Sequence, residues 1–262
     1  MLAEPAKEPF NDPEWIFEPK WDGIRIIAYV QGERVRLLSR NLQNFTGLFA
    51  SVAEDLKTVG VPVVLDGEVV ALGADGRPEF SLLQQSLRPG KQPRTGHVSY
   101  IVFDCLCVNG HNLKDRPLRE RYAVLAALKH ALNSDAVRVT APFPGDISTT
   151  VYEECQRQGL EGVVAKRLAS KYHPGKRTKD WRKYPVPEAR GVRRGRVSVV
   201  GAQSNEHVDP GPVRPEGQAR LRRDGRERAV ARYAEGDARG VEGHGYRDVS
   251  VYAGSDAPRS VG

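Results

Sequence analysis

The sequence predicts an α+β fold in which antiparallel sheets are flanked by helices. Through about residue 185, short strand-like runs alternate with amphipathic helical ones. The helical runs form separate blocks, and one pair of strand-like runs is joined by a turn short enough for a hairpin. Short strands with segregated helices are typical of α+β domains. A chain of 262 residues holds one large domain, or a domain with a small second one, and either buries a substantial core.

Apolar and β-branched runs predict the strands. The first two runs flank a polar loop that contains Lys20, and Gln31-Gly32-Glu33 is a hairpin turn between the second and third. In the fourth run, Asp66-Gly67-Glu68 separates two apolar stretches. The predicted strands cover residues 15–17, 25–30, 35–38, 63–70, 101–108 and 161–165.

Three segments carry apolar residues at helical spacing. Phe45–Val59 has its charged residues on the opposite face, which is the pattern of a helix that packs on a sheet. The other two predicted helices start at Pro78 and at Pro117, the latter ending at Leu132. Proline suits the first helical turn, where a missing N–H is harmless.

The chain is basic, with a net charge of +7 and a pI near 9.4. Excess positive charge favours polyanionic partners, because neutralising phosphates releases counterions. No apolar stretch is as long as a membrane span, and residues 1–5 resemble no secretion signal. We therefore expect a cytoplasmic protein, a monomer, with no membrane partner.

From Val186 onward the composition changes. This stretch has no Lys, Ile, Phe or Trp, and Leu221 is its only leucine. Such a segment buries too little apolar surface to offset the entropy of ordering it, so we expect residues 186–262 to be largely disordered, with only Arg196–Val200 as a weak strand. Lysines also stop at this place, which suggests that the segment is translated in a reading frame other than its ancestral one.

The most specific chemical signal is Lys20-Trp21-Asp22-Gly23-Ile24-Arg25. Most lysines are solvated charges, but one beside an acid, a glycine and an arginine has the setting of a covalent nucleophile. Further polar segments follow at strand ends and within strands: Ser39-Arg40-Asn41, Asp66-Gly67-Glu68, Phe103-Asp104, Glu161-Gly162-Val163-Val164-Ala165-Lys166 and Trp181-Arg182-Lys183.

This ordered set resembles the nucleotidyltransferase domain of ATP-dependent DNA ligases, with its ATP-grasp-like fold. The resemblance is greatest to small bacterial ligases and to the ligase module of bacterial end-joining enzymes, and it covers residues 1–185. It implies that Lys20 attacks the α-phosphorus of ATP and forms lysine-AMP. The attack requires the neutral amine, so the pKa of Lys20 must be lowered by burial or by neighbouring cations such as Lys166 and Lys183.

The resemblance also implies roles for other residues. Arg25 contacts the ribose or phosphates, Glu68 the ribose, and Glu161 binds Mg²⁺. The remaining nucleotide-binding residues are Glu18, Phe103, Lys166 and Lys183, with Phe103 stacking on adenine, and Arg40 contacts a phosphate at a DNA nick. The implied cofactors are ATP and Mg²⁺, and the implied partners are nicked or broken double-stranded DNA and end-joining proteins.

Structural explanations stay open for most of these residues when each is taken alone. Glu68 and Glu161 lie in apolar strands, and a buried salt bridge offsets their desolvation as well as a metal or ribose does. Phe103 fits an ordinary core, and Arg40 fits a polar loop. In a regular strand Glu161 and Lys166 point to opposite faces, so Lys166 needs a bulge or a strand end to reach the site.

Two departures from the family pattern limit the expected activity. Pro185 stands where many ligases carry a second lysine after Lys183, and no sequence for an oligonucleotide-binding barrel follows. We therefore expect a truncated enzyme with weak self-adenylation and poor sealing. The alternatives are a catalytically inactive nick- or end-binding module and a nucleotidyltransferase that acts on RNA.

Overall fold

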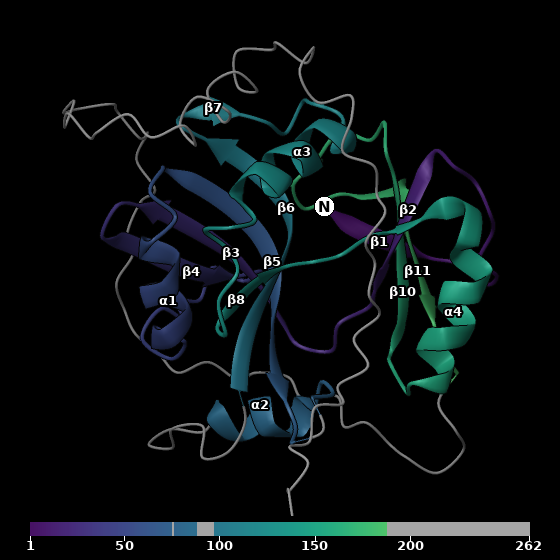
Figure 1. Ribbon diagram of the computed structural model, residues 1–262, viewed down its shortest axis with the longest axis horizontal. Coiled ribbons are helices and arrows are strands. Elements are labelled where there is room, and N and C mark those ends of the chain that lie inside the picture. The colour runs from purple at the N-terminus through teal and green to yellow at the C-terminus, as the bar shows by residue number, and fades with distance from the viewer. Residues whose placement is uncertain (75, 88–96, 188–262) are drawn as a thin grey trace, which may run out of the picture.

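The computed structural model describes residues 1–74, 76–87 and 97–187, which form two β-sheets and the helices that pack on them (Figure 1). The mixed α+β architecture agrees with the sequence prediction. The C-terminal segment that was predicted to be disordered lies beyond the described residues from position 188 onward, and so does its predicted weak strand at 196–200. Among the helices of the described part, none is long and apolar enough to cross a membrane.

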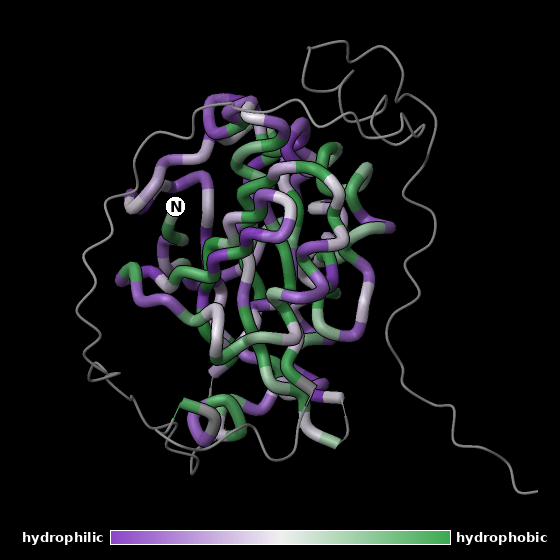
Figure 2. The backbone as a smooth tube through the Cα atoms, turned by 90° about the vertical axis from the view of Figure 1, so that its left-hand side faces the viewer, coloured by the Kyte–Doolittle hydropathy of each residue, from purple (hydrophilic) through white to green (hydrophobic). Residues whose placement is uncertain are grey.

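The larger sheet has the strand order β4-β3-β5-β6-β7, with β8 pairing beside β6. Helices α1, α2 and α3 contribute to one continuous apolar core on a single face of this sheet. Apolar segments run through the middle of this body and polar ones lie at its turns (Figure 2). The elements are β3 (Ile24–Gln31), β4 (Arg34–Ser39), α1 (Ala50–Lys57), β5 (Val63–Leu72), α2 (Phe80–Ser86), β6 (His97–Val108), β7 (His111–Asn112), α3 (Leu118–Leu128) and β8 (Val137–Val139).

The smaller sheet has the order β1-β11-β10-β2-β9. Helix α4 packs on it through Val151 and Cys155, which join Phe17 and Val163 in a second, smaller core. In Figure 1 this helix lies on the side of the smaller sheet that faces away from the larger one. The elements are β1 (Leu2–Pro5), β2 (Trp15–Pro19), β9 (Phe143–Pro144), the 3₁₀ turn η1 (Gly145–Ile147), α4 (Ser148–Arg157), β10 (Gly162–Arg167) and β11 (Arg177–Pro185).

Most strand pairs are antiparallel, as predicted, and the hairpin at Gly32 joins β3 to β4 through residues 32–33. Two pairs, β1–β11 and β6–β8, are parallel, contrary to the expectation of purely antiparallel sheets. Both involve short strands whose partner lies far away in sequence. Local alternation cannot reveal such a pairing, and β1 was not predicted at all.

The predicted helices begin later than the apolar spacing suggests, because their first residues pair with strands. The N–H of Phe45 donates to the carbonyl of Leu37 at 2.8 Å, so α1 starts at Ala50. Likewise the N–H of Glu79 donates to the carbonyl of Ala71 at 2.8 Å, which delays α2 to Phe80. Pro117 is the residue before the first helical residue of α3, not part of the helix.

Helix α4 was missed by the sequence analysis. Its buried residues are Ser148, Val151 and Cys155, Tyr152 is partly buried against the same core, and its other residues are polar. The helix carries few apolar residues, so it lacks the apolar run on which the prediction of the other helices depended. The spacing of Val151, Tyr152 and Cys155 was the feature that could have revealed it.

Candidate active site

Lys20 lies where the two sheets meet. It follows β2 of the smaller sheet and precedes β3 of the larger one, and its backbone N–H donates to the carbonyl of Gly162 at 2.8 Å. Its ammonium forms an ion pair with the carboxylate of Glu161, and the two side chains are 22% and 28% exposed. The predicted nucleophile and the predicted metal ligand are therefore in direct contact, and both are open to solvent.

Gly23 and Gly162 allow this junction to close. A Cβ on Gly23 would lie 2.2 Å from the carbonyl oxygen of Val69, so the loop after Lys20 approaches β5 more closely than any other residue permits. The constraint is this close approach, whereas the sequence suggested only the backbone freedom of a turn. Gly162 has φ +139° and a Cβ there would lie 2.1 Å from the carbonyl of Tyr184.

The conformation of Gly162 also resolves the predicted parity problem at Lys166. Strand β10 begins at Gly162, so Glu161 lies outside the strand, contrary to the prediction. Within β10 the register is regular: Val163 and Ala165 pack in the smaller core, and Val164 and Lys166 line a pocket on the other face. Lys166 therefore needs no bulge to reach the site.

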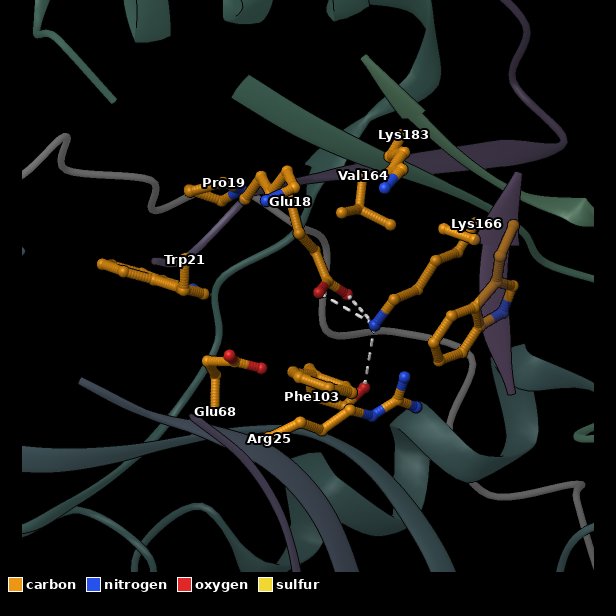
Figure 3. A pocket seen from close by; sticks show the side chains of 12 residues that line it. Glu18, Pro19, Trp21, Arg25, Glu68, Phe103, Val164, Lys166 and Lys183 are labelled. Carbon is orange, nitrogen blue, oxygen red and sulfur yellow. Dashed lines mark hydrogen bonds and ion pairs between the residues drawn. The ribbon is translucent and has the colours of Figure 1, made fainter. Parts of the chain in front are cut away.

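A pocket of about 180 Å³ lies between the sheets beside Lys20 (Figure 3). It brings together seven of the nine predicted site residues. The seven that line it are Glu18, Lys20, Arg25, Glu68, Phe103, Lys166 and Lys183. Glu161 does not line the pocket but contacts Lys20, which does. Arg40 is exposed on the turn after β4.

Glu18 and Lys166 form a buried ion pair in the pocket wall. The Nζ of Lys166 lies 2.9 Å from each carboxylate oxygen of Glu18, and it also donates to the carbonyl of Phe103 at 3.3 Å. The same ammonium is 4.2 Å from the centroid of the Phe103 ring and 4.4 Å from that of Trp181. Burial raises the pKa of Glu18 to about 7, and the charge of Lys166 opposes that rise. Lys166 is thus neutralised locally and in contact with two aromatic rings.

Arg25 is fixed by a second buried carboxylate. Its Nε donates to Oδ1 of Asp66 at 2.9 Å and its Nη2 to Oδ2 at 2.6 Å. The hydroxyl of Tyr172 donates to the same Oδ2 at 2.7 Å, and Nη1 of Arg25 donates to the carbonyl of Met1 at 2.6 Å. The Arg25 guanidinium holds the pKa of Asp66 below its usual value although burial acts to raise it. Arg25 thus reaches the pocket in one fixed orientation.

Phe103 lies at a β-bulge in β6. Gly67 pairs with Val102 and Asp66 pairs with Asp104, which leaves Phe103 without a partner on β5. The extra residue shifts the alternation of β6, so Val102 and Cys105 both face the core of the larger sheet. Phe103 instead lines the pocket and contacts Trp181 edge-on, with ring centroids 6.2 Å apart. A bulge that turns one side chain toward a site is a recurrent feature of sheets near functional positions.

Glu68 and Lys183 face the pocket with no hydrogen-bonded or ion-paired side-chain partner within the described ranges. Burial raises the pKa of Glu68 to about 8, against the charges of Arg25 and Lys20. Both side chains are half-buried. Since polar groups at this depth need partners, these two are the groups most available to a bound molecule.

In the part of the chain that the structure describes, no cluster of three or more metal-ligating side chains occurs. Mg²⁺ in nucleotide sites is commonly held by one or two carboxylates together with substrate phosphates, and it keeps several waters. Glu161 is one such carboxylate, and its charge acts on Glu68 in the same region. The donor set therefore fits a phosphate-bridged Mg²⁺ and does not fit a closed protein cage.

Trp21, Val164 and Trp181 also line the pocket and were not predicted as site residues. The indole N–H groups of both tryptophans are buried without a hydrogen-bond partner within the described residues. Alternation was the available signal, because Val164 lies two residues before Lys166 and Trp181 two before Lys183. Trp21 lies next to the predicted nucleophile.

The chain belongs to a family of nucleotidyl-transferring enzymes: the family described as ATP dependent DNA ligase domain matches residues 1–184. The end-joining protein LigD of Pseudomonas aeruginosa is 36% identical over 181 residues, which cover 69% of this chain and 21% of that protein. The prophage-derived DNA ligase-like protein LigB of Bacillus subtilis is 32% identical, over 70% of this chain and 65% of that protein.

Solved structures agree with this family. A mycobacterial DNA ligase D complexed with ATP and MES has a TM-score of 0.57 and 32% identity, over 70% of this chain and 60% of the other. The ligase domain of Mycobacterium tuberculosis LigD has a TM-score of 0.58 and 31% identity, covering 70% and 58%. The chain thus spans less than two thirds of the length of each of these relatives.

Proposed function

We propose that this chain uses ATP to form a covalent lysine-AMP at Lys20, as the first step of DNA end sealing. The observation that carries the proposal is the position of Lys20 in the lining of the pocket, in contact with Glu161 and together with Glu68, Lys166 and Lys183. A nucleophile, carboxylates for a metal and cations for phosphates are the groups that nucleotidyl transfer requires.

In the proposed reaction, the neutral Nζ of Lys20 attacks the α-phosphorus of ATP. An N–P bond forms, the bond between the α-phosphorus and the bridging oxygen breaks, and pyrophosphate leaves. In the structure the Nζ of Lys20 is paired with Glu161. Separation of Glu161 from Nζ is therefore required before attack, and the amine proton passes to solvent through the exposed mouth of the pocket. Mg²⁺ held by Glu161 would supply neutralisation of phosphate charge.

The pocket residues divide between base, ribose and phosphates. Phe103 offers an aromatic surface from the larger sheet for the flat base, and Glu68 accepts hydrogen bonds from the ribose hydroxyls. Lys183 is the better-placed phosphate ligand, because its ammonium has no ion-pair partner within the described residues. Lys166 can contact a phosphate only after its ion pair with Glu18 opens. We therefore assign Lys166 and Glu18 to the pocket wall beside the nucleotide.

DNA is the proposed second substrate. After the first step, AMP passes from Lys20 to a 5′-phosphate, and the adjacent 3′-hydroxyl then displaces AMP to seal the strand. The exposed Arg40 is the proposed contact to a phosphate at the break, and the basic charge of the chain supports a polyanionic partner. With one lysine in the last motif, we expect weak self-adenylation and slow sealing. End-joining proteins are the proposed partners, by extension from the LigD relatives.

The experiment is incubation of the purified chain with Mg²⁺ and ATP labelled at the α-phosphate, followed by a denaturing gel. Label should survive denaturation and be lost in Lys20→Ala, while Lys183→Ala should reduce it without abolishing it. Label at the γ-phosphate should not remain on the protein. A folded, unlabelled wild-type chain would contradict the proposal and favour a nick- or end-binding module. Transfer of label to nicked RNA in preference to nicked DNA would favour an RNA-directed enzyme.

A further inference from the structure

Leu42 is an exposed apolar residue in a conformation that leucine rarely adopts. Its side chain is 77% exposed and its φ is +60°. Among the described residues, the other non-glycine residue with positive φ is Asn109, and asparagine tolerates the left-handed region far better than leucine does. The position would suit glycine for the backbone and a polar side chain for solvent. Leucine satisfies neither condition.

The turn that carries Leu42 is closed by three hydrogen bonds centred on Ser39. The N–H of Ser39 donates to the carbonyl of Gln43 at 2.9 Å, and the N–H of Leu42 donates to the carbonyl of Ser39 at 2.9 Å. The N–H of Gln43 donates to the Ser39 hydroxyl at 3.2 Å. Residues 40–42 therefore form a fixed tip that presents Arg40 and Leu42 together, both of them exposed.

This tip lies at the pocket end of the β3–β4 hairpin. Ser39 pairs with Ile26, and the preceding residue on β3 is Arg25, which lines the pocket. Neighbouring strands are about 4.8 Å apart, so the tip begins one strand spacing from the pocket wall.

Exposed arginines extend from the tip along β4, the edge strand of the larger sheet. Arg34 and Arg36 are both exposed, and Arg36 pairs across the strands with the half-exposed Tyr29. Arg36 and Arg40 are four residues apart, about 13 Å in an extended chain, which is comparable to about four base-pair steps of duplex DNA. The charge of this edge fits a phosphate backbone better than an apolar protein partner.

We propose that Leu42 is an apolar wedge that packs against the sugar and base edge at a DNA break, beside a phosphate bound by Arg40. At a nick the base stack is interrupted on one strand, so an apolar side chain enters there more easily than in an intact duplex. The wedge gives the exposed apolar side chain a contact that accounts for a leucine in a strained backbone conformation. The inference rests on the proposed function in that it takes DNA as substrate.

The test is fluorescence anisotropy of the full chain with nicked and intact duplexes of the same sequence, at several salt concentrations. Leu42→Gly should weaken binding to nicked DNA about tenfold, the loss expected when one leucine is no longer buried, and bind intact duplex almost unchanged. Leu42→Met should bind like wild type. Arg40→Ala should weaken both duplexes and lower the salt dependence, whereas Leu42→Gly should leave that dependence unchanged.

Folding is separated from binding by the choice of variant. Glycine accepts φ +60° without strain, so Leu42→Gly should melt no lower than wild type, and a binding loss cannot be attributed to unfolding. Ile147→Ala is the matched control, since Ile147 is also an exposed apolar residue, 44% exposed, but lies on the smaller sheet's side. It should change nothing.

Equal binding of nicked DNA by wild type and Leu42→Gly would overturn the wedge, as would a loss in Leu42→Met as large as in Leu42→Gly. ATP labelling is measured in parallel, because Leu42 does not line the pocket and its replacement should leave labelling unchanged. Absent labelling with Leu42-dependent nick binding would overturn the proposed enzymatic function and leave the wedge standing. Normal labelling together with binding that does not depend on Leu42 would overturn the wedge and leave the proposed enzymatic function standing.

Discussion

Two ion pairs in this protein involve the same kinds of groups in opposite environments. Asp104 and Arg121 are fully buried, and Arg121 is bound by both carboxylate oxygens at 2.7 and 2.9 Å and by two backbone carbonyls. Lys20 and Glu161 are about a quarter exposed and bind mainly each other. The buried pair is saturated and fastens α3 to β6. The exposed pair can separate and bind something else, which makes it suitable for chemistry.

The largest effect is expected from breaking the buried pair. Asp104→Asn leaves the Arg121 charge buried without a counterion, and we expect the free energy of unfolding to fall by about 3–5 kcal/mol. Urea unfolding followed by circular dichroism measures it. The control is Glu154→Gln in the exposed Glu154–Arg157 pair, which should leave the unfolding midpoint nearly unchanged. Equal effects of the two variants would show that burial does not distinguish the pairs.

Breaking the exposed pair should affect activity and spare stability. Glu161→Gln should change the free energy of unfolding by less than about 1 kcal/mol, as is usual for solvent-exposed pairs. Self-adenylation should fall about 100-fold, the cost typical of losing one charge-stabilising group. Initial rates of ATP labelling at saturating Mg²⁺ measure this, with Glu161→Asp as the partial rescue. A stability loss as large as that of Asp104→Asn would remove the contrast between the two regions.

A smaller effect is expected from removing the hydroxyl of Tyr172. Tyr172→Phe removes one hydrogen bond from Asp66 but leaves both bonds from Arg25, so the loss should be about 1 kcal/mol, or about 2–4 °C in Tm. Because Arg25 becomes less firmly held, the KM for ATP should rise more than kcat falls. Tyr152→Phe is the control, since its hydroxyl bonds the Pro185 carbonyl at an exposed site. An unchanged KM would assign Tyr172 to stability alone.

A pH dependence is expected at Glu68. Burial raises the pKa of this carboxyl to about 8 from 4.5, so between those values the folded state binds more protons than the unfolded state. The contribution of Glu68 to stability therefore declines as pH rises through that window. Glu68→Gln lacks this term, so its Tm relative to wild type should increase steadily between pH 5 and pH 9. A Tm difference that is constant with pH would show that Glu68 is ionised throughout.

Much of the fold was predictable because its signals are local. The apolar runs on either side of Lys20 and the turn at Gly32 specify β2, β3 and β4 through alternation and turn chemistry alone. The resemblance of the motifs then named seven of the residues that line one pocket. The predicted helix boundaries were less accurate, because the N–H groups of Phe45 and Glu79 donate to strand carbonyls. The spacing of the apolar residues does not reveal these bonds.

The sequence by itself determined the α+β class, the candidate nucleophile Lys20 and the family, since these depend on residue types in a fixed order. The tertiary structure decided which charges are free. It neutralised Lys166 with Glu18 and Arg25 with Asp66, it put Glu161 outside β10 and against Lys20, and it placed Phe103 at a bulge that faces the pocket. Ion pairs and register depend on segments distant in sequence, and a linear pattern does not contain the distances between them.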